Sequence, residues 1–349
     1  MYRVDHALRT VAEMTDERAA SARTPHALCV EDLSVTFRTF EGEARVVDRA
    51  SLTVESGELV GVVGETGCGK SVLMRALLDM LPTATSRVEG SIALDGQDLR
   101  RLSPRERRAR LLTYFSMVFQ DPVGSLNPVF TIGDQLREVV GQAARRLGRR
   151  DGRAGLEARA RALVGRVQLD DPERILRSYP FQLSGGMNQR VSIALALSTD
   201  PWLIVADEPT TALDVTVQAE ILALFTRLVR EEGRSVLLIT HSLGVVRTIA
   251  DRVLVMYAGV VVEEAPAEEL FDRPQHPYTV GLLGCVPRLT GEALGPGIPG
   301  TLPSYTSAPS GCRFHPRCPR VMPVCVERRP PAFETAPGHR VACWLYDER

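Results

Sequence analysis

Eight residues in the first quarter of the chain combine glycines, a lysine and a serine at a spacing suited to phosphate binding. The stretch GETGCGKS, residues 64–71, fits the pattern G-x-x-x-x-G-K-[ST] between an apolar run and a helical pattern. In such a loop the backbone N–H groups surround phosphate oxygens, and the following helix adds positive potential. We expect Lys70, the only lysine in the sequence, to reach the β- and γ-phosphates and Ser71 to ligate Mg²⁺.

Two carboxylates and a histidine follow apolar runs further along the chain. Asp207 ends the run WLIVAD, Glu208 comes next, and His241 follows SVLLIT. If both runs are strands of the sheet that carries the phosphate-binding loop, their carboxyl ends meet that loop at one edge. There Asp207 can hold Mg²⁺ through water, Glu208 can orient or deprotonate an attacking water, and His241 can contact the γ-phosphate. The set predicts hydrolysis of a nucleoside triphosphate.

The elements that must position these residues form an α/β arrangement. An apolar run leads into the loop and a helical pattern leaves it, and two further strands enclose a helical pattern at 216–233. Residues 27–56 alternate apolar and polar side chains, which predicts antiparallel strands. Residues 100–180 are rich in arginine and lack strong strand signals, which predicts helices with one solvated face. After residue 266 proline and glycine become frequent, which predicts an appended, loop-rich module.

Composition narrows the classes of function further. The 349 residues are 44% hydrophobic, and 42 Lys and Arg nearly balance 43 Asp and Glu, so no basic field indicates a nucleic-acid partner. The first 26 residues carry charges throughout and lack the apolar core of a secretory signal. The longest apolar runs are far shorter than the roughly 20 residues needed to span a bilayer. Any membrane role is therefore expected to depend on partner proteins.

Four further motifs give the chain a specific resemblance. They are LSGGMNQR at 183–190, VFQDP with Gln120, TALD ending in Asp214, and THS with His241. Together with the phosphate-binding loop and the DE pair, and in their order along the chain, they resemble the motif set of ABC transporter ATPases across residues 27–265. The stretches MVFQDPVGSLNP and DEPTTALDVTVQAEIL, and the tail VEEAPAEELFDRPQHPYTVGLL, look like the D-type ATPase subunit of oligopeptide and dipeptide importers.

This resemblance implies a P-loop ABC ATPase fold of the α/β class. Such a fold contains a RecA-like parallel sheet, an antiparallel β part and a helical subdomain, here expected at about 121–183. The ATPase domain is then 27–265, preceded by an N-terminal extension at 1–26. A C-terminal extension of the oligopeptide-importer type follows at 266–349, and we expect it to be a small metal-binding module.

The resemblance also assigns roles to individual residues. In a head-to-tail dimer, the SGG of one cassette would cover the γ-phosphate bound by Lys70 of the other, because a helix that starts with SGG offers bare N–H groups to an anion. Catalytic roles fall to Glu208, His241, Gln120 and Lys70. The expected Mg²⁺ ligands are Ser71, Gln120 and Asp207. The expected contacts to ATP are Gly64, Glu65, Thr66, Gly67, Cys68, Gly69, Lys70, Ser71, Val72, Phe40, Ser184, Gly185, Gly186 and Asp214.

Some positions leave a choice or depart from the usual pattern. The aromatic residue that stacks on adenine is expected to be Phe40, with Phe37 as the alternative. Asn188, Ser242 and Thr211 stand where other residues are common in the family. None of these changes removes a predicted phosphate, Mg²⁺ or water ligand, so the site is expected to hydrolyse ATP.

Four of the seven cysteines lie close together at the end of the chain. Cys312, Cys318, Cys325 and Cys343 are spaced C-x5-C-x6-C-x17-C, without the C-x2-C pairs of most zinc ribbons. Four thiolates can hold either zinc or a [4Fe-4S] cluster. Because related peptide-importer ATPases carry a similar tail, in some cases with such a cluster, the iron-sulfur cluster is favoured over zinc, with free thiols as the third possibility.

The leading hypothesis for function is the ATP-hydrolysing subunit of an ABC importer for peptides or related small solutes. The implied partners are a related F-type ATPase, two membrane permease subunits and an extracytoplasmic substrate-binding protein, with no nucleic acid. The chain would then lie peripherally on the cytoplasmic face of the plasma membrane. The alternative is a soluble ABC ATPase in nucleic-acid, translation or iron-sulfur metabolism.

Overall fold

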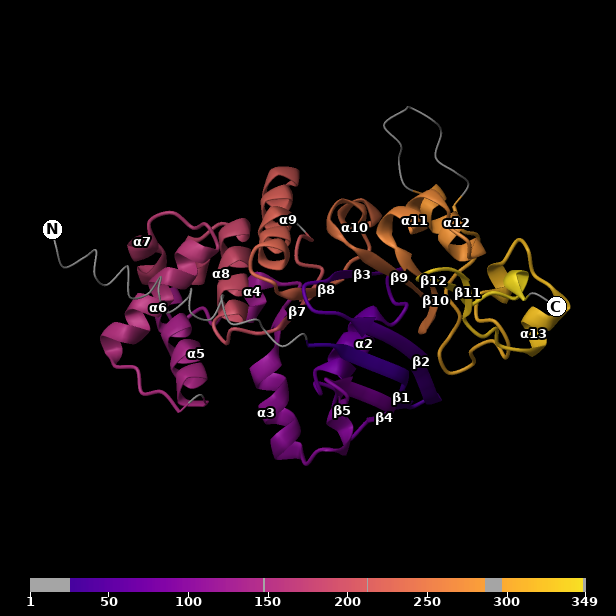
Figure 1. The fold of residues 1–349 in the computed structure, drawn as a ribbon, viewed down its shortest axis with the longest axis horizontal. Coiled ribbons are helices and arrows are strands. Elements are labelled where there is room, and N and C mark those ends of the chain that lie inside the picture. Colours follow the sequence, from indigo (N-terminus) through magenta and orange to yellow (C-terminus); the bar gives the residue numbers. More distant parts are fainter. Residues whose placement is uncertain (1–25, 147, 212, 286–296, 348–349) are drawn as a thin grey trace.

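An eight-stranded sheet forms the centre of the molecule, and its middle strands are parallel. The computed structural model describes residues 26–146, 148–211, 213–285 and 297–347. The strand order is β11-β12-β10-β9-β3-β8-β7-β6 (Figure 1). Its strands are β3 (Leu59–Val63), β6 (Phe115–Val118), β7 (Leu203–Asp207), β8 (Ser235–Ile239), β9 (Arg252–Tyr257), β10 (Val260–Pro266), β11 (Phe333–Ala336) and β12 (His339–Val341). Strands β3, β7 and β8 are buried at every position, as expected of parallel strands covered on both faces.

A second, antiparallel sheet packs beside the first and confirms the strands predicted at 27–56. Its order is β2-β1-β4-β5. These strands are β1 (Leu28–Thr39), β2 (Gly42–Val54), β4 (Ser86–Leu94) and β5 (Gln97–Asp98). The apolar faces of β1, β2 and β4 share a core with β3 and with α2 (Lys70–Leu77), the helix that follows the phosphate-binding loop. The loop is therefore held between the two sheets.

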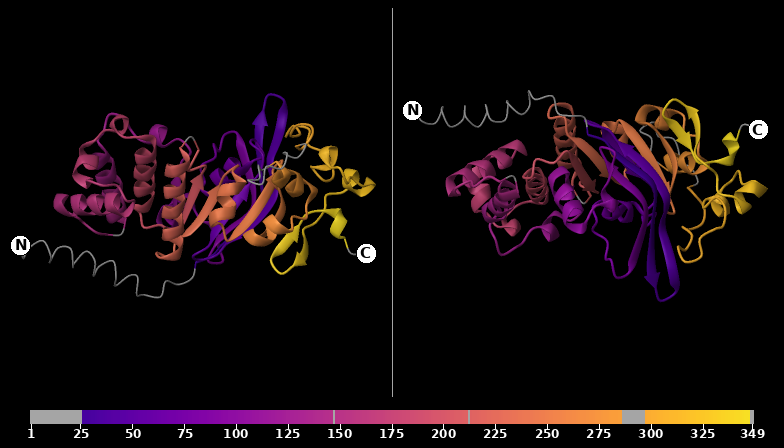
Figure 2. Two further views of the ribbon diagram at one scale, coloured as in Figure 1. Left: turned by 90° about the horizontal axis from the view of Figure 1, so that it is seen from above. Right: turned by 60° about the horizontal axis from the view of Figure 1, so that its bottom comes forward.

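Helices make up most of the segment that the sequence predicted to be helical. In chain order they are α3 (Pro104–Tyr114), α4 (Pro122–Ser125), α5 (Ile132–Arg146), α6 (Arg153–Arg166) and α7 (Pro172–Arg177), followed by α8 (Gly185–Leu197). Helices α5 to α7 form one end of the elongated molecule in both Figure 1 and Figure 2. The prediction missed β6, because a strand of four residues with only two buried side chains leaves almost no periodic signal.

Three further helices connect or cover the later strands. They are α9 (Val215–Arg230) between β7 and β8, α10 (Leu243–Ile249) between β8 and β9, and α11 (Ala267–Asp272) after β10. Beyond α11 lie α12 (Pro277–Gly284) and α13 (Pro323–Glu327). None of the helices that the structure describes is both long and apolar enough to cross a membrane.

The C-terminal region is joined to the cassette through the main sheet. Strand β12 pairs antiparallel with β10, and β11 pairs with β12, so the tail extends the sheet at its edge. Phe314 of the tail is buried in a core that it shares with Tyr257 of β9 and Tyr278 of α12. The segment after residue 266 is thus rich in loops, as predicted, but it shares the core of the ATPase domain.

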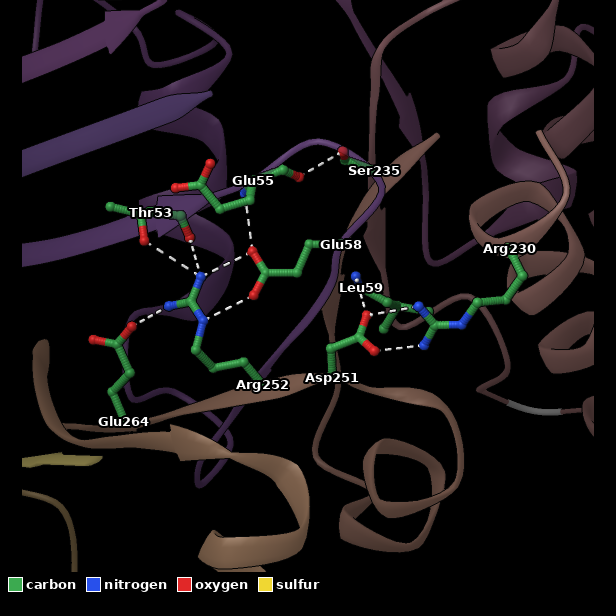
Figure 3. A network of polar contacts seen from close by, with 9 residues as sticks. All are labelled: Thr53, Glu55, Glu58, Leu59, Arg230, Ser235, Asp251, Arg252 and Glu264. Atoms are coloured by element: carbon green, nitrogen blue, oxygen red, sulfur yellow. Dashed lines mark hydrogen bonds and ion pairs between the residues drawn. The ribbon is translucent and has the colours of Figure 1, made fainter. Parts of the chain in front are cut away.

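A partly buried arginine connects the two sheets at the start of β9. The guanidinium of Arg252 pairs with Glu58 at 2.9 and 3.0 Å, pairs with Glu264, and donates to the carbonyl of Thr53 in β2 at 2.8 Å. The neighbouring Asp251 accepts the N–H of Leu59 at 2.8 Å and pairs with Arg230 of α9. Figure 3 shows this network, which fixes the antiparallel sheet against the strand that leads into the phosphate-binding loop.

Candidate nucleotide-hydrolysis site

The order of the strands brings the predicted motifs together. Strands β3, β8, β7 and β6 are consecutive neighbours and run parallel, so their carboxyl ends lie along one edge of the sheet. The phosphate-binding loop follows β3, His241 follows β8, Glu208 follows β7 and Gln120 follows β6. In parallel sheets ligands bind at this edge. Residues separated by more than a hundred positions in the sequence therefore meet at one site.

The phosphate-binding loop has the conformation that its glycines allow. Gly64 has a φ of 152°, and a β-carbon there would collide with the carbonyl oxygen of Met256. The side chain of Lys70 is buried, and its Nζ donates to the carbonyls of Gly64 at 2.8 Å and Glu65 at 3.0 Å. Burial raises the pKa of the Cys68 thiol above its ordinary value, so the thiol stays neutral beside that ammonium. The cation is therefore held within the loop, as phosphate binding requires.

The two residues predicted to bind Mg²⁺ from the loop and from β7 contact each other. The hydroxyl of Ser71 lies 3.3 Å from Oδ1 of Asp207. Burial raises the pKa of Asp207, and the Ser71 hydroxyl partly opposes this effect. A hydroxyl and a carboxylate oxygen are ligands suited to Mg²⁺, which would favour the ionised carboxylate. The donor set therefore fits the predicted ion.

Glu208 is held through both its backbone and its carboxylate. Its backbone has a φ of 46°, a strained value for a residue with a side chain, and its N–H donates to the carbonyl of Ile239 in β8 at 2.8 Å. Its carboxylate contacts His241 Nδ1 at 3.0 Å, Thr211 Oγ1 at 2.8 Å and Gln120 Nε2 at 3.3 Å. Burial alone would raise the pKa of Glu208, but the bonds from His241 and Thr211 outweigh it and lower the pKa. A carboxylate that stays ionised suits a group that orients or deprotonates water.

Thr211 contacts the candidate catalytic carboxylate, although the sequence treated it only as a departure from the usual pattern. Its hydroxyl bonds the carboxylate of Glu208, three residues away. The sequence signal that could have identified this contact is a hydroxyl side chain three residues after Glu208. Ser, the residue common at this position, can make the same bond. Gln120, predicted to have a catalytic role and to bind Mg²⁺, contacts Glu208, so it lies beside the predicted Mg²⁺ ligands.

The motif LSGGMNQR, residues 183–190, forms the N-terminus of α8. The hydroxyl of Ser184 accepts the N–H of Met187 at 3.3 Å and caps the helix, while a side chain at Gly186 would collide with Val217 of α9. The unusual Asn188 is buried, and its amide donates to the carbonyls of Pro180 and Leu183 at 3.0 and 3.3 Å. Within the described part of the chain, no hydrogen bond joins the Ser184–Gly186 turn to the phosphate-binding loop.

The remaining nucleotide contacts are placed as follows. Phe40 follows β1 at the turn into β2 and is fully exposed, whereas Phe37 packs partly buried against the core, so Phe40 has the free aromatic face. Asp214 accepts the N–H of Val217 at 3.0 Å and caps α9. Thr66 and Gly67 are exposed, and Val72 packs against the core. The roles of these residues in nucleotide binding stay predictions.

The four tail cysteines converge, but a metal site is not confirmed. Burial, together with the nearby thiols of Cys325, Cys343 and Cys318, raises the pKa of Cys312 to about 11. The backbone N–H of Cys312 also donates to the carbonyl of Cys325 at 2.8 Å. Even so, no group of three or more His, Cys, Asp or Glu side chains among the described residues is arranged to hold a metal ion. The predicted metal-binding module is therefore not supported by this arrangement of the side chains.

Fold and site together define a class of protein. The site combines a phosphate-binding loop that holds a buried lysine, a carboxylate and a hydroxyl suited to Mg²⁺, and an ionised glutamate at the same edge of the sheet. This arrangement can bind and hydrolyse a nucleoside triphosphate. The SGG helix start and the separate helical part distinguish the ATP-binding cassette ATPases within that broad group.

Comparisons with known proteins identify the family. Residues 47–211 match the ABC transporter model, and residues 262–325 match the C-terminal region of oligopeptide/dipeptide transporters. The chain is 45% identical to the dipeptide transport ATP-binding protein DppD of Bacillus subtilis, over 92% of this chain and 95% of that protein. It is 42% identical to the oligopeptide transport ATP-binding protein OppD of Salmonella typhimurium, over 94% and 97%. The chain belongs to the family of ABC transporter ATP-binding subunits of the oligopeptide and dipeptide type.

A solved structure supports the same assignment. The cassette MJ0796, described as a dimer in a post-hydrolysis state bound to ADP and Pi, superposes with a TM-score of 0.60 and 27% identity, covering 69% of this chain and 98% of that one. The predicted ABC cassette fold and ATPase class are thereby confirmed. The alternative of a soluble ATPase outside transport is not favoured, because these relatives are named as transport ATP-binding proteins.

Proposed function

We propose that this chain hydrolyses ATP to drive import of peptides or related small solutes through a membrane complex. The observation that carries the ATPase role is the ionised Glu208, fixed by His241, Thr211 and Gln120 at the edge of the sheet that carries Lys70. The names of the relatives and the matched C-terminal region support the peptide class. Family membership also supports a peripheral position on the cytoplasmic face of the membrane.

Each residue contributes a separate part of the proposed reaction. Lys70 and the loop amides hold the β- and γ-phosphates, while Ser71 and Asp207 would hold Mg²⁺, which neutralises charge that develops on the phosphates. Glu208 accepts a hydrogen bond or a proton from the attacking water. His241 and Thr211 keep its carboxylate in one orientation, and Gln120 connects the site to the segment that follows β6.

Two measurements test this function. Glu208→Gln in the assembled complex is expected to reduce ATP turnover by about 10³-fold or more while ATP still binds. Unchanged turnover would contradict the role of Glu208. In the reconstituted wild-type complex, peptide on the binding protein is expected to stimulate turnover. A lack of response to a broad peptide panel would contradict the peptide class.

A second cassette is expected to complete the ATP site. We propose that this second cassette is a related F-type ATPase. Completion by a second cassette is supported by the N-terminus of α8, which offers bare N–H groups and makes no hydrogen bond to the phosphate-binding loop in the described part of its own chain. The dimeric state of the similar cassette MJ0796 also supports it. The chain alone is expected to turn over ATP slowly and to speed up when the partner ATPase is added. Equal rates would contradict a composite site.

The proposed permease contact lies next to Gln120. Several large apolar side chains are exposed on the segments around α4 and before α8, namely Phe119, Val123, Val129, Phe130 and Phe181. Exposure of large apolar side chains to water is unfavourable, so such a surface indicates a site of protein binding. These side chains support binding of two permease subunits, to which an extracytoplasmic binding protein delivers cargo. Val129→Glu is expected to weaken copurification with the permeases without affecting nucleotide binding.

The finer proposal for the tail is a [4Fe-4S] cluster, with zinc as the alternative. The chemistry of the donor set supports it, because four neighbouring and partly buried thiols would bind a soft metal once deprotonated. Cys312, Cys318, Cys325 and Cys343 would hold the group, which would clip the loops of the tail. Protein purified without oxygen is expected to contain about four irons and four sulfides per chain, as four-cysteine ligation of such a cluster requires, and to lose both in Cys318→Ser. One zinc, or no metal, would contradict the cluster.

A further inference from the structure

The C-terminal region contacts the phosphate-binding loop through three side chains. The hydroxyl of Tyr278 accepts the N–H of Glu65 at 2.9 Å, and the hydroxyl of Tyr305 donates to the carbonyl of Gly67 at 2.6 Å. Arg317 Nη1 lies 3.0 and 3.2 Å from the two carboxylate oxygens of Glu65. All three side chains come from the region after residue 266, and none was among the residues that the sequence placed at the nucleotide site.

Glu65 connects these tail residues to the catalytic lysine. Its carbonyl accepts Lys70 Nζ at 3.0 Å, while its N–H is bound by Tyr278 and its carboxylate by Arg317. The same residue is therefore held by the lysine on one side and by the tail on the other. Any movement of Tyr278 or Arg317 would displace the carbonyl to which Lys70 is anchored.

Arg317 is fixed firmly enough to position the loop. Its side chain is only 6% exposed, its Nε donates to the carbonyl of Pro299 at 2.7 Å, and its guanidinium lies over the ring of Tyr257 at 5.6 Å. A further nitrogen, Nη2, donates to the carbonyl of Ile298 at 3.2 Å. Because the guanidinium is held by several partners, its charge stays next to Glu65 at little further cost in side-chain entropy.

The charge of Glu65 matters because the loop must bind a polyanion. A carboxylate in the second position of the phosphate-binding loop repels the phosphates of ATP, and partial burial reduces the screening by solvent and salt. Arg317 supplies the compensating charge. Among the described residues, Arg317 is the cation that pairs with the carboxylate of Glu65.

We propose that Arg317 is a positioning residue of the nucleotide site, through which the C-terminal region sets the affinity for ATP. It cancels the charge of Glu65, and together with Tyr278 and Tyr305 it holds the loop in the conformation that binds phosphate. This role rests on the assignment of the chain as an ATPase but not on the identity of the transported solute.

Equilibrium titration of the full chain with Mg-ATP and with Mg-ADP tests the proposal. Arg317→Met is expected to weaken Mg-ATP binding about tenfold, equivalent to ~1.4 kcal/mol, and Mg-ADP binding less, because ADP carries less negative charge. Adding Glu65→Gln to Arg317→Met is expected to restore affinity to that of Glu65→Gln alone. Arg273→Met removes an arginine with a 79% exposed side chain and is the matched control, expected to bind like wild type.

The outcomes separate electrostatic positioning from a general structural role. The proposal is overturned if Arg317→Met binds Mg-ATP like the wild type, if the double variant binds as weakly as Arg317→Met, or if Arg273→Met loses as much affinity. Tyr305→Phe deletes one hydroxyl and avoids removing a buried charge, so it keeps the test open if Arg317→Met fails to fold. It is expected to weaken both nucleotides by roughly threefold, in line with the loss of one hydrogen bond, and unchanged affinity would contradict the role of the tail. Transport is not measured, so a failure of the peptide-import proposal does not affect the result.

Discussion

His241 Nδ1 lies 3.0 Å from Oε1 of Glu208, so the histidine that follows β8 orients the carboxylate that follows β7. The two residues are separated by 33 positions and meet because β7 and β8 are parallel neighbours. The backbone of Glu208 is strained, so the position of its carboxylate depends on such contacts.

Removing the imidazole should therefore affect the chemical step more than binding. His241→Ala is expected to lower the ATP turnover of the assembled complex by about 10²-fold, the lower range for a group that assists proton transfer, while the affinity for Mg-ATP changes little. His26→Ala is the matched control, because His26 also pairs with a carboxylate, Asp95, but does so outside the site. Normal turnover in His241→Ala would contradict the orienting role.

Thr211 offers a milder test of the same carboxylate. Thr211→Val keeps the shape of the side chain but removes the hydroxyl that bonds Glu208 at 2.8 Å. Turnover is expected to fall about tenfold, as one hydrogen bond to a charged group is worth ~1.5 kcal/mol or more. Thr211→Ser retains the hydroxyl and is expected to keep most of the activity. If the Ser variant were as impaired as the Val variant although it retains the hydroxyl, loss of the hydroxyl would not explain the effect, and the role of this bond would be contradicted.

Arg252 is expected to be important for stability because its partly buried guanidinium pairs with two acids. Arg252→Leu leaves Glu58 and Glu264 without their shared cation and is expected to lower the free energy of unfolding by about 3–5 kcal/mol. Denaturant unfolding of the full chain measures this change. Arg273→Leu, at an exposed arginine, is expected to cost little. A loss of less than 1 kcal/mol in Arg252→Leu, on the order of an exposed pair, would contradict the role of the network.

His276 makes the stability of the C-terminal region depend on pH. Burial lowers its pKa from 6.5 to about 4, although Glu263 opposes the shift. Between these values the unfolded chain binds a proton that the folded chain does not, so stability present above pH 6.5 is lost as the pH falls toward 4. The difference is worth about 3 kcal/mol for a shift of this size.

His276→Asn isolates this contribution. Asparagine can still accept the N–H of Tyr278, as His276 does at 3.0 Å, but it does not titrate. The variant is expected to lose less stability between pH 6.5 and 4 than the wild type. The surrounding Glu263, His339 and Glu269 are present in both proteins, so the difference between the two profiles reports on the residue at position 276. Identical pH profiles would rule out His276 as the source.

The sequence alone determined the phosphate-binding loop, the position of Glu208 as the candidate catalytic residue, the order of the cassette motifs and the family. These features are contiguous motifs, and their chemistry needs residue types at a fixed local spacing, so they can be identified without coordinates. Strands β3, β7 and β8 were also predictable, because parallel strands buried on both faces are continuous apolar runs.

Only the tertiary structure decided how distant segments meet. The pairing of β12 with β10, the bond from Thr211 to Glu208 and the contact between Arg317 and Glu65, 252 positions apart, have no local signature. The short strand β6, which brings Gln120 to Glu208, is recognisable only by its pairing with β7. Local periodicity reports which face of an element is buried, whereas contacts between elements depend on the packing of the whole chain. For this reason the sequence predicted the chemistry of the site, and the structure alone placed the C-terminal region against it.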